Sequence, residues 1–182
     1  MQNKFVWIIS VIAMVMVMIL GNRKVRLLVV VREQVKVFKN AKTHKVSIWD
    51  HICFWVLPIV ASYISVFKIG IVINKSLAEV LTTVFSIIFT VLFGFAAILI
   101  CKIDSGNKTE RQVAEETFVS IVSSTILSLI ATVLSIIFTQ LKCEELLQII
   151  STMIIAISLI IIMLLLLITK RIFYLYIKKK DQ

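Results

Sequence analysis

The sequence has few of the residues on which enzyme motifs depend. Its 182 residues include only four glycines and one proline, and twenty basic residues outnumber ten acidic ones. No glycine-rich phosphate loop, nucleophile elbow or paired-carboxylate motif can be identified. We therefore expect no enzymatic activity and no bound cofactor.

The three cysteines and two histidines do not have the spacing of a zinc site. The nearest grouping consists of His44, Asp50, His51, Cys53 and Cys101. We expect no metal there and interpret the two cysteines of this group as reduced, buried small residues. Cys143 has no expected partner within the chain, so any disulfide that it forms would join two protomers.

Long apolar runs dominate the rest of the chain. Hydrophobic residues make up 60% of the sequence, and the mean hydropathy is +1.04. The runs cover residues 5–20, 52–73, 80–101, 118–138 and 146–169. A helix needs about 20 apolar residues to cross a hydrocarbon core about 30 Å thick. The sequence thus predicts an all-α, polytopic transmembrane helical bundle of four to five spans, forming one membrane domain over residues 1–182 and assembling as an oligomer.

The first run is the shortest and has more than one interpretation. A helix over residues 5–20 would be only about 24 Å long, so it is either a short span or a re-entrant or interfacial segment. A cleaved signal peptide is disfavoured, because no small-residue cleavage pattern follows Leu20 and the strongly basic stretch comes after the run.

Basic residues are concentrated in alternate connections. Segments 21–50, 102–116 and 170–182 carry eight, three and five lysines and arginines, whereas segments 68–79 and 140–145 carry two and one. Since cytoplasmic loops are enriched in Lys and Arg, we expect segment 21–50, loop 102–116 and tail 170–182 to be cytoplasmic. With five spans, the amino terminus would then lie outside and the carboxyl terminus inside.

The same inner segments are candidates for binding lipid or a protein partner. Topology explains most of the positive charge, but cationic side chains beside a membrane also bind anionic lipid or an acidic protein face. Direct nucleic-acid binding is not expected, because no aromatic residues interleave with the basic ones in the manner of single-strand sites. The candidate docking residues are Arg23, Lys24, Arg26, Arg32, Lys36, Glu110, Arg111, Glu115, Glu116, Arg171, Lys178, Lys179 and Lys180.

Residues 23–40 have an amphipathic pattern. One face of a helix would carry Leu27, Leu28, Val31, Val35 and Phe38, with charged residues opposite. This favours a helix at the cytoplasmic interface or one that extends the first span. A short strand pair is the alternative, because many of these residues are β-branched.

Small and hydroxyl residues recur every four positions in two predicted spans. The third-span stripe consists of Thr82, Ser86, Thr90 and Gly94, and the fourth-span stripe consists of Ser120, Ser124, Ser128 and Thr132. Such stripes allow close approach of helix backbones, so we expect them to pack the two spans together or to join protomers. A wetted pore lining is the alternative.

Two residues of the second span have structural consequences. Pro58 is the only proline, and inside a helix it removes one backbone hydrogen bond and kinks the chain. It and Gly94 are candidate points of bending. Lys68 lies about five residues before the predicted end of the span, from where its side chain can reach the headgroups.

Three stretches resemble a family of defence proteins. They read DHICFWVLP over residues 50–58, LAEVL over 77–81 and SIIFTVLFG over 86–94. This pattern resembles the KwaA membrane subunits of the Kiwa anti-phage system. The resemblance implies an oligomer in the bacterial inner membrane that senses envelope perturbation and works with a cytosolic DNA-binding subunit, KwaB. It implies no catalytic residue, and the family usually has four spans.

We therefore expect an inner-membrane sensor or scaffold that recruits or regulates a cytosolic effector. The alternative is a pore-forming or holin-like effector that depolarises the membrane. A small transporter is disfavoured, because the sequence has no internal repeat and no broken helix paired with a midplane charge.

Overall fold

The computed structural model describes residues 27–37, 48–103 and 108–180, and every regular element in them is helical. The elements are α2 (Leu27–Val37), α3 (Ile48–His51), a π-helical turn η1 (Ile52–Val56), α4 (Leu57–Phe67), α5 (Lys75–Ile103), α6 (Lys108–Gln140) and α7 (Glu144–Lys180). The predicted all-α helical bundle is confirmed. The helix predicted within residues 23–40 is confirmed as α2, and the strand pair is not formed there.

Four helical segments are long and apolar enough to cross a membrane. They cover Trp49–Phe67, Lys75–Ile100, Arg111–Gln140 and Glu144–Phe173. These correspond to the second to fifth predicted spans. The first apolar run, residues 5–20, lies outside the described residues, so the described part of the chain accounts for four of the five runs.

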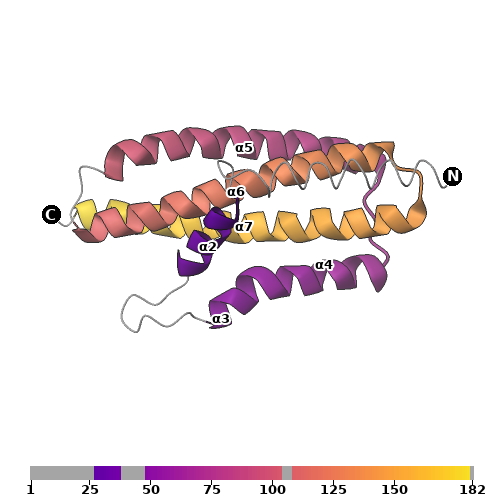
Figure 1. Cartoon of the computed structure of the whole chain (residues 1–182), viewed down its shortest axis with the longest axis horizontal. Coiled ribbons are helices and arrows are strands. Elements are labelled where there is room, and N and C mark those ends of the chain that lie inside the picture. The colour runs from indigo at the N-terminus through magenta and orange to yellow at the C-terminus, as the bar shows by residue number, and fades with distance from the viewer. Residues whose placement is uncertain (1–26, 38–47, 104–107, 181–182) are drawn as a thin grey trace.

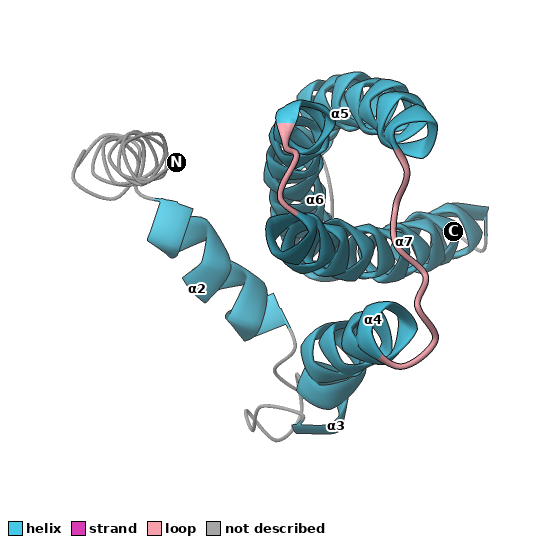
Figure 2. Cartoon of the chain, turned by 90° about the vertical axis from the view of Figure 1, so that its right-hand side faces the viewer, coloured by secondary structure: helices cyan, strands magenta, loops and turns pink. Residues whose placement is uncertain are grey.

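Helices α5, α6 and α7 run alternately up and down, and α6 packs against both of its neighbours (Figure 1). Helix α4 packs against α7 and lies on the far side of α7 from α5 (Figure 2). The carboxyl ends of α5 and α7 and the amino end of α6 lie at one end of the bundle, which we call the basic end, and α3 lies toward the same end (Figure 1). The α4–α5 and α6–α7 connections lie at the opposite end.

The three long helices pack with a seven-residue repeat. The most buried positions recur at this interval in each helix and are Ala78, Phe85 and Leu92 in α5; Thr117, Ser124, Ala131 and Phe138 in α6; and Ile154, Ile161 and Ile168 in α7. A sustained seven-residue repeat keeps one seam of a helix against its partner and is typical of left-handed helix packing. The core therefore lies along α6, which is the most buried of the four long segments.

A second buried series on α6 completes this pattern. Ala114, Ile121, Ser128 and Ser135 are also seven residues apart and are almost inaccessible. Most of the buried side chains of α6 are therefore small, and small side chains let helix backbones approach closely in a bundle. This explains how α6 can contact α5 and α7 along its length.

The only proline lies next to an irregular helical turn. Pro58 is buried near the start of α4, directly after η1, and the Leu57 N–H donates to the Ile52 carbonyl across five residues. Single π turns insert one residue into a helix and change its direction, as expected beside a residue that lacks an N–H. Pro58, Ser62 and Val66, four residues apart, form the buried face of α4. The helix is thus irregular just before Pro58, one of the two predicted points of bending, whereas the other, Gly94, lies within the uninterrupted helix α5.

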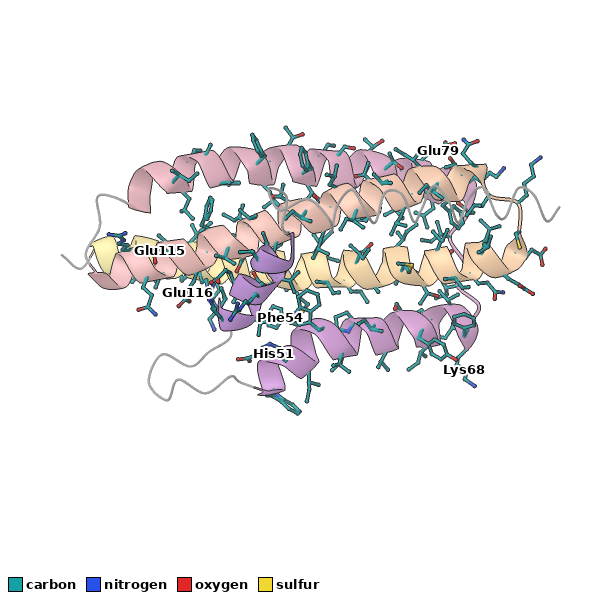
Figure 3. The ribbon with its side chains drawn as sticks, in the orientation of Figure 1. His51, Phe54, Lys68, Glu79, Glu115 and Glu116 are labelled. Atoms are coloured by element: carbon teal, nitrogen blue, oxygen red, sulfur yellow. The ribbon has the colours of Figure 1, made fainter. Side chains whose placement is uncertain are left out.

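The second span ends earlier than the sequence indicated. Helix α4 stops at Phe67, and Gly70 has a positive φ of 80°, a conformation that glycine adopts without strain. The predicted end at residue 73 is therefore wrong for the helix, and exposed Lys68 lies at the end of the helix rather than five residues inside it. Figure 3 shows Lys68 and Glu79 near the same end of the bundle.

The connection between α4 and α5 is hydrogen-bonded to α7 and to the first turn of α5. The Ile73 N–H donates to Ser151 Oγ on α7 over 3.3 Å, and both residues are buried. Asn74 then caps α5, because its Oδ1 accepts from the Leu77 N–H at 2.8 Å. The seven-residue connection, residues 68–74, is thereby fixed against α7 and at the start of α5.

Candidate functional site

A partly buried ion pair joins α6 and α7 near the basic end. Arg171 Nη2 lies 3.2 Å from Glu116 Oε2, and the two side chains are 15% and 31% exposed. Arg171 Nη1 also donates to Ser120 Oγ, 3.4 Å away. Glu116 accepts a second hydrogen bond from Gln112 Nε2 at 3.2 Å. The charge of Arg171 is thus neutralised by a carboxylate on the neighbouring helix, which holds the two helices in one register.

The adjacent turn of α6 holds the separate helix α2. Gln34 of α2 is 1% exposed, and its Oε1 accepts a hydrogen bond from Ser123 Oγ at 3.0 Å. Val37 lies on the same face and is also buried. The second polar atom of the amide, Gln34 Nε2, is buried without a hydrogen-bond partner among the described residues. Ser120 and Ser123 are three residues apart, so α6 binds Arg171 and Gln34 from neighbouring positions of one helical turn.

The face that α2 buries differs from the apolar face predicted from the sequence. Val31, at the centre of the predicted face, is 50% exposed, while Gln34 and Val37 are buried. The periodicity of apolar residues identified the helix correctly, and the bundle is contacted by a different face from the apolar one. The difference arises because Ser123 offers a buried hydroxyl that favours a polar partner. The side chains of Leu27, Leu28 and Phe38 lie outside the part that can be described.

The fourth-span stripe packs inside the bundle. Ser120, Ser124 and Ser128 are fully buried, and Thr132 is partly buried. Their hydroxyls donate to carbonyls of α6 itself at 2.8 to 3.1 Å. Serine and threonine satisfy themselves in this way within apolar surroundings. The stripe is therefore buried within one chain, with its hydroxyls bonded to its own helix.

The third-span stripe does not face α6. Ser86, Thr90 and Gly94 are exposed on the outside of α5, and Thr82 is only partly buried. The expectation that the two stripes pack against each other in one chain is wrong. Ala78, Phe85 and Leu92 make the contact instead, because they follow the seven-residue repeat while the stripe follows a four-residue repeat. The interpretation as a contact between protomers stays open, since the stripe points away from the bundle.

The candidate docking residues are divided between the basic end and segments that are not described. Arg32 and Lys36 are exposed on α2, where Lys36 pairs with Glu33. Arg111 and Glu115 form a 2.9 Å ion pair on the surface of α6. Glu115 and Glu116 lie toward the basic end (Figure 3). Residues Arg23, Lys24 and Arg26 lie outside the described residues, as do the side chains of Glu110, Lys178, Lys179 and Lys180.

The described cysteine and histidine residues do not form a metal-binding cluster. Among the described residues, no group of three or more His, Cys, Asp or Glu is placed to hold a metal ion. Cys53 is half-buried in the π turn, and Cys143 is exposed at the opposite end of the bundle, each as a free thiol. The Cys101 side chain and His44 lie outside the described part.

Two contact residues were not identified from the sequence. Gln34 was overlooked because it is a single polar residue among valines and charges, and Ser123 because it falls between the four-residue steps of the stripe. The available signal was the adjacent pair Ser123 and Ser124, which places hydroxyls on two neighbouring faces of α6. One of these faces packs in the bundle and the other receives α2.

The structure is an all-α bundle with four helices suited to crossing a membrane. Near one end, the contacts Glu116–Arg171 and Ser123–Gln34 form what we call the polar junction. Comparison with known protein families, curated proteins and solved structures finds no match.

Proposed function

We propose that this protein is a bacterial inner-membrane sensor or scaffold subunit of an anti-phage defence system, which recruits or regulates a cytosolic effector. The observation that carries the proposal is the polar junction, in which α6 binds α7 through Glu116 and Arg171 and binds α2 through Ser123 and Gln34. The resemblance of three stretches to the KwaA family supports the defence role and a KwaB-like partner.

The distribution of charge supports a cytoplasmic orientation for the basic end. The chain segments at this end include Arg111, Lys170, Arg171 and the three lysines that end α7, whereas Lys68, Lys75 and Lys142 are at the opposite end. By the positive-inside rule, the end richer in Lys and Arg faces the cytoplasm. The exposed parts of α2, the start of α6 and the end of α7 then form the surface offered to a soluble partner.

The proposed mechanism is mechanical. A change in bilayer thickness or lateral tension alters helix tilt, at a cost of fractions of a kcal/mol per Å of mismatch. Because α6 packs along both α5 and α7, a change in their relative tilt acts on the junction at its inner end. The partner senses the membrane through the resulting change in the surface around α2, α6 and α7.

The test is purification of the detergent-solubilised protein from its native operon, followed by mass analysis of the complex. We expect an oligomer that carries one cytosolic protein. Lys170→Glu, an exposed change at the basic end, should reduce the amount of partner, and the matched control Lys142→Glu at the opposite end should not. An oligomer without any cytosolic partner would contradict the scaffold role.

A pore-forming effector is the second candidate. It is favoured by the outward position of Ser86 and Thr90 on α5, because an oligomer with its α5 helices around an axis would place these hydroxyls on that axis. The hydroxyls of the fourth-span stripe do not support a path through one chain, since they bond to carbonyls of their own helix. Ion flux from liposomes that contain the purified protein alone would support the pore.

A further inference from the structure

We propose that α2 is a reversibly docked helix, and that Gln34 keeps its attachment to α6 weak enough to be released. The release of α2 involves only this chain and does not depend on the proposed function. That the undocked form is the state read by the effector rests on the proposed function.

The attachment of α2 depends on a small contact face. Helix α6 is the element on which α2 packs, and the buried α2 side chains that can be described are Gln34 and Val37. Among the residues that the structure describes, one side-chain hydrogen bond, from Ser123 to Gln34, joins the two helices. In contrast, α5, α6 and α7 bury residues at three or more successive heptad steps each. The described docking contact of α2 is therefore far smaller than the contacts that hold the bundle.

The amide of Gln34 weakens this contact further. Its Oε1 accepts from Ser123, but Nε2 is buried without an acceptor among the described residues. A buried donor that loses water and gains no partner disfavours the state that buries it. Leucine, which has a similar shape and no polar atoms, would avoid this cost. Glutamine at this position thus weakens the docked state, because in the undocked state water can bond to both polar atoms of the amide.

The remaining faces of α2 suit a second location. Val29 and Val31 are about half exposed at 49% and 50%, and Arg32 and Lys36 are exposed beside them. A short helix with apolar and cationic faces binds the boundary between headgroups and acyl chains. The faces that the bundle leaves uncovered are therefore the ones that a membrane surface can bind after release. Docked and surface-bound α2 are alternative arrangements of the same helix.

The docking site of α2 on α6 lies beside the contact between Arg171 of α7 and α6, which depends on how the two long helices are aligned along their axes. Ser123 holds Gln34, and Ser120, three residues earlier, accepts from Arg171 of α7. A shift of α7 along α6 displaces the Arg171 side chain within one helical turn of the α2 contact. Repacking of the two long helices can therefore change the occupancy of the α2 site, because the site has little binding energy to lose.

The experiment measures the distance between α2 and α6 in the full chain. Cys53, Cys101 and Cys143 are replaced by serine, spin labels are attached at Arg32→Cys and Gln112→Cys, both exposed positions, and the protein is placed in lipid nanodiscs. We expect a short-distance docked population and a longer, undocked one. Gln34→Leu should raise the docked-to-undocked ratio by about tenfold, through removal of the unpaired buried donor.

Gln34→Glu should have the opposite effect and deplete the docked population, because an ionised carboxylate would have to be buried beside Ser123. The matched control is Gln148→Leu, which makes the same change at an exposed position of α7 and should leave the distances unchanged. A docked population that decreases or stays the same with Gln34→Leu would overturn the proposal. So would a single docked distance that Gln34→Glu does not alter.

A second readout follows the docking of α2 by chemical accessibility instead of distance. Val37→Cys, whose native side chain is 8% exposed and makes no hydrogen bond, is tested for reaction with a water-soluble maleimide. Reaction should be slowed by Gln34→Leu, and Ala131→Cys, buried in the core, should stay unreactive. Neither readout needs phage or a partner. If release is seen but no cytosolic protein is captured from the operon, the proposed function fails while the reversible docking of α2 stands.

Discussion

Arg171 of α7 and Glu116 of α6 form an ion pair with 3.2 Å between nitrogen and oxygen, and the residue that precedes Glu116 in the sequence, Glu115, takes no part in it. Glu115 instead pairs with Arg111 on its own helix, at more than half exposure. Two consecutive carboxylates thus have different roles. One joins two helices beside buried serines, and the other lies on the surface of α6.

This difference predicts unequal effects of the same substitution. Glu116→Ala leaves the mostly buried guanidinium of Arg171 without its carboxylate and should lower the free energy of unfolding by about 2 kcal/mol. Glu115→Ala removes an exposed pair and should cost about 0.5 kcal/mol or less. Thermal unfolding in detergent, followed by the loss of the monodisperse peak on size exclusion, compares the two variants. Equal losses of thermal stability would show that the pair does not hold α6 to α7.

The heptad seam of α6 predicts a site that cannot tolerate a larger side chain. Ala131 is fully buried in the cluster formed with Phe85 and Ile154, so Ala131→Leu must displace a neighbouring helix. We expect a loss of about 1–3 kcal/mol in stability. Val133→Leu, two residues away and 48% exposed, is the matched control and should have little effect in the same assay. A native-like stability of Ala131→Leu would contradict close packing at this position.

The outward stripe of α5 predicts a contact between protomers. A side chain at Gly94 would meet nothing within 4 Å in one chain, and Thr90 is exposed one turn away. The double change Thr90→Leu and Gly94→Leu should therefore leave the bundle stable while reducing the oligomer mass, since leucine prevents close approach of helices through small residues. Native mass spectrometry is the measurement.

The control for this experiment is Thr83→Leu, which changes an exposed threonine of the same helix outside the stripe. It should leave the oligomer mass unaltered. If the double variant also keeps the native mass, the stripe does not join protomers, and Ser86 and Thr90 lose their support as pore-lining residues.

Cys143 allows a direct test of orientation. It is an exposed, free thiol in the α6–α7 connection, at the end opposite to the basic end. With the basic end in the cytoplasm, a membrane-impermeant maleimide should label Cys143 in intact spheroplasts. Gln112→Cys, in a chain with Cys143→Ser, should be labelled only after the membrane is opened. The reverse pattern would invert the proposed topology.

Much of the fold could be predicted from the sequence because the bilayer imposes a simple length requirement. Runs 80–101, 118–138 and 146–169 correspond to α5, α6 and α7, although each helix continues beyond the apolar run. The extensions carry polar residues such as Arg111 and Glu144, which hydropathy assigns to loops. Backbone hydrogen bonding continues a helix into the headgroup region regardless of side-chain polarity.

The candidate site was predictable only in part. The stripe containing Ser124 and Ser128 was expected to pack and is buried in the bundle, whereas Glu116 and Arg171 were expected to dock lipid or a partner and instead pair with each other. That these last two meet each other, and that Gln34 meets Ser123, depends on contacts across 55 and 89 residues of sequence. No local pattern indicates which polar side chain on one helix will face which on another.

The sequence by itself determined the class of protein and the ends of the bundle that carry positive charge, because hydrophobic length and loop charge act locally along the chain. Only the tertiary structure decided which faces pack. The serine stripe of α6 faces inward and the similar stripe of α5 faces outward, although both repeat every four residues. The reason is that a seam between long helices follows a seven-residue repeat, and only in α6 do the small residues coincide with it.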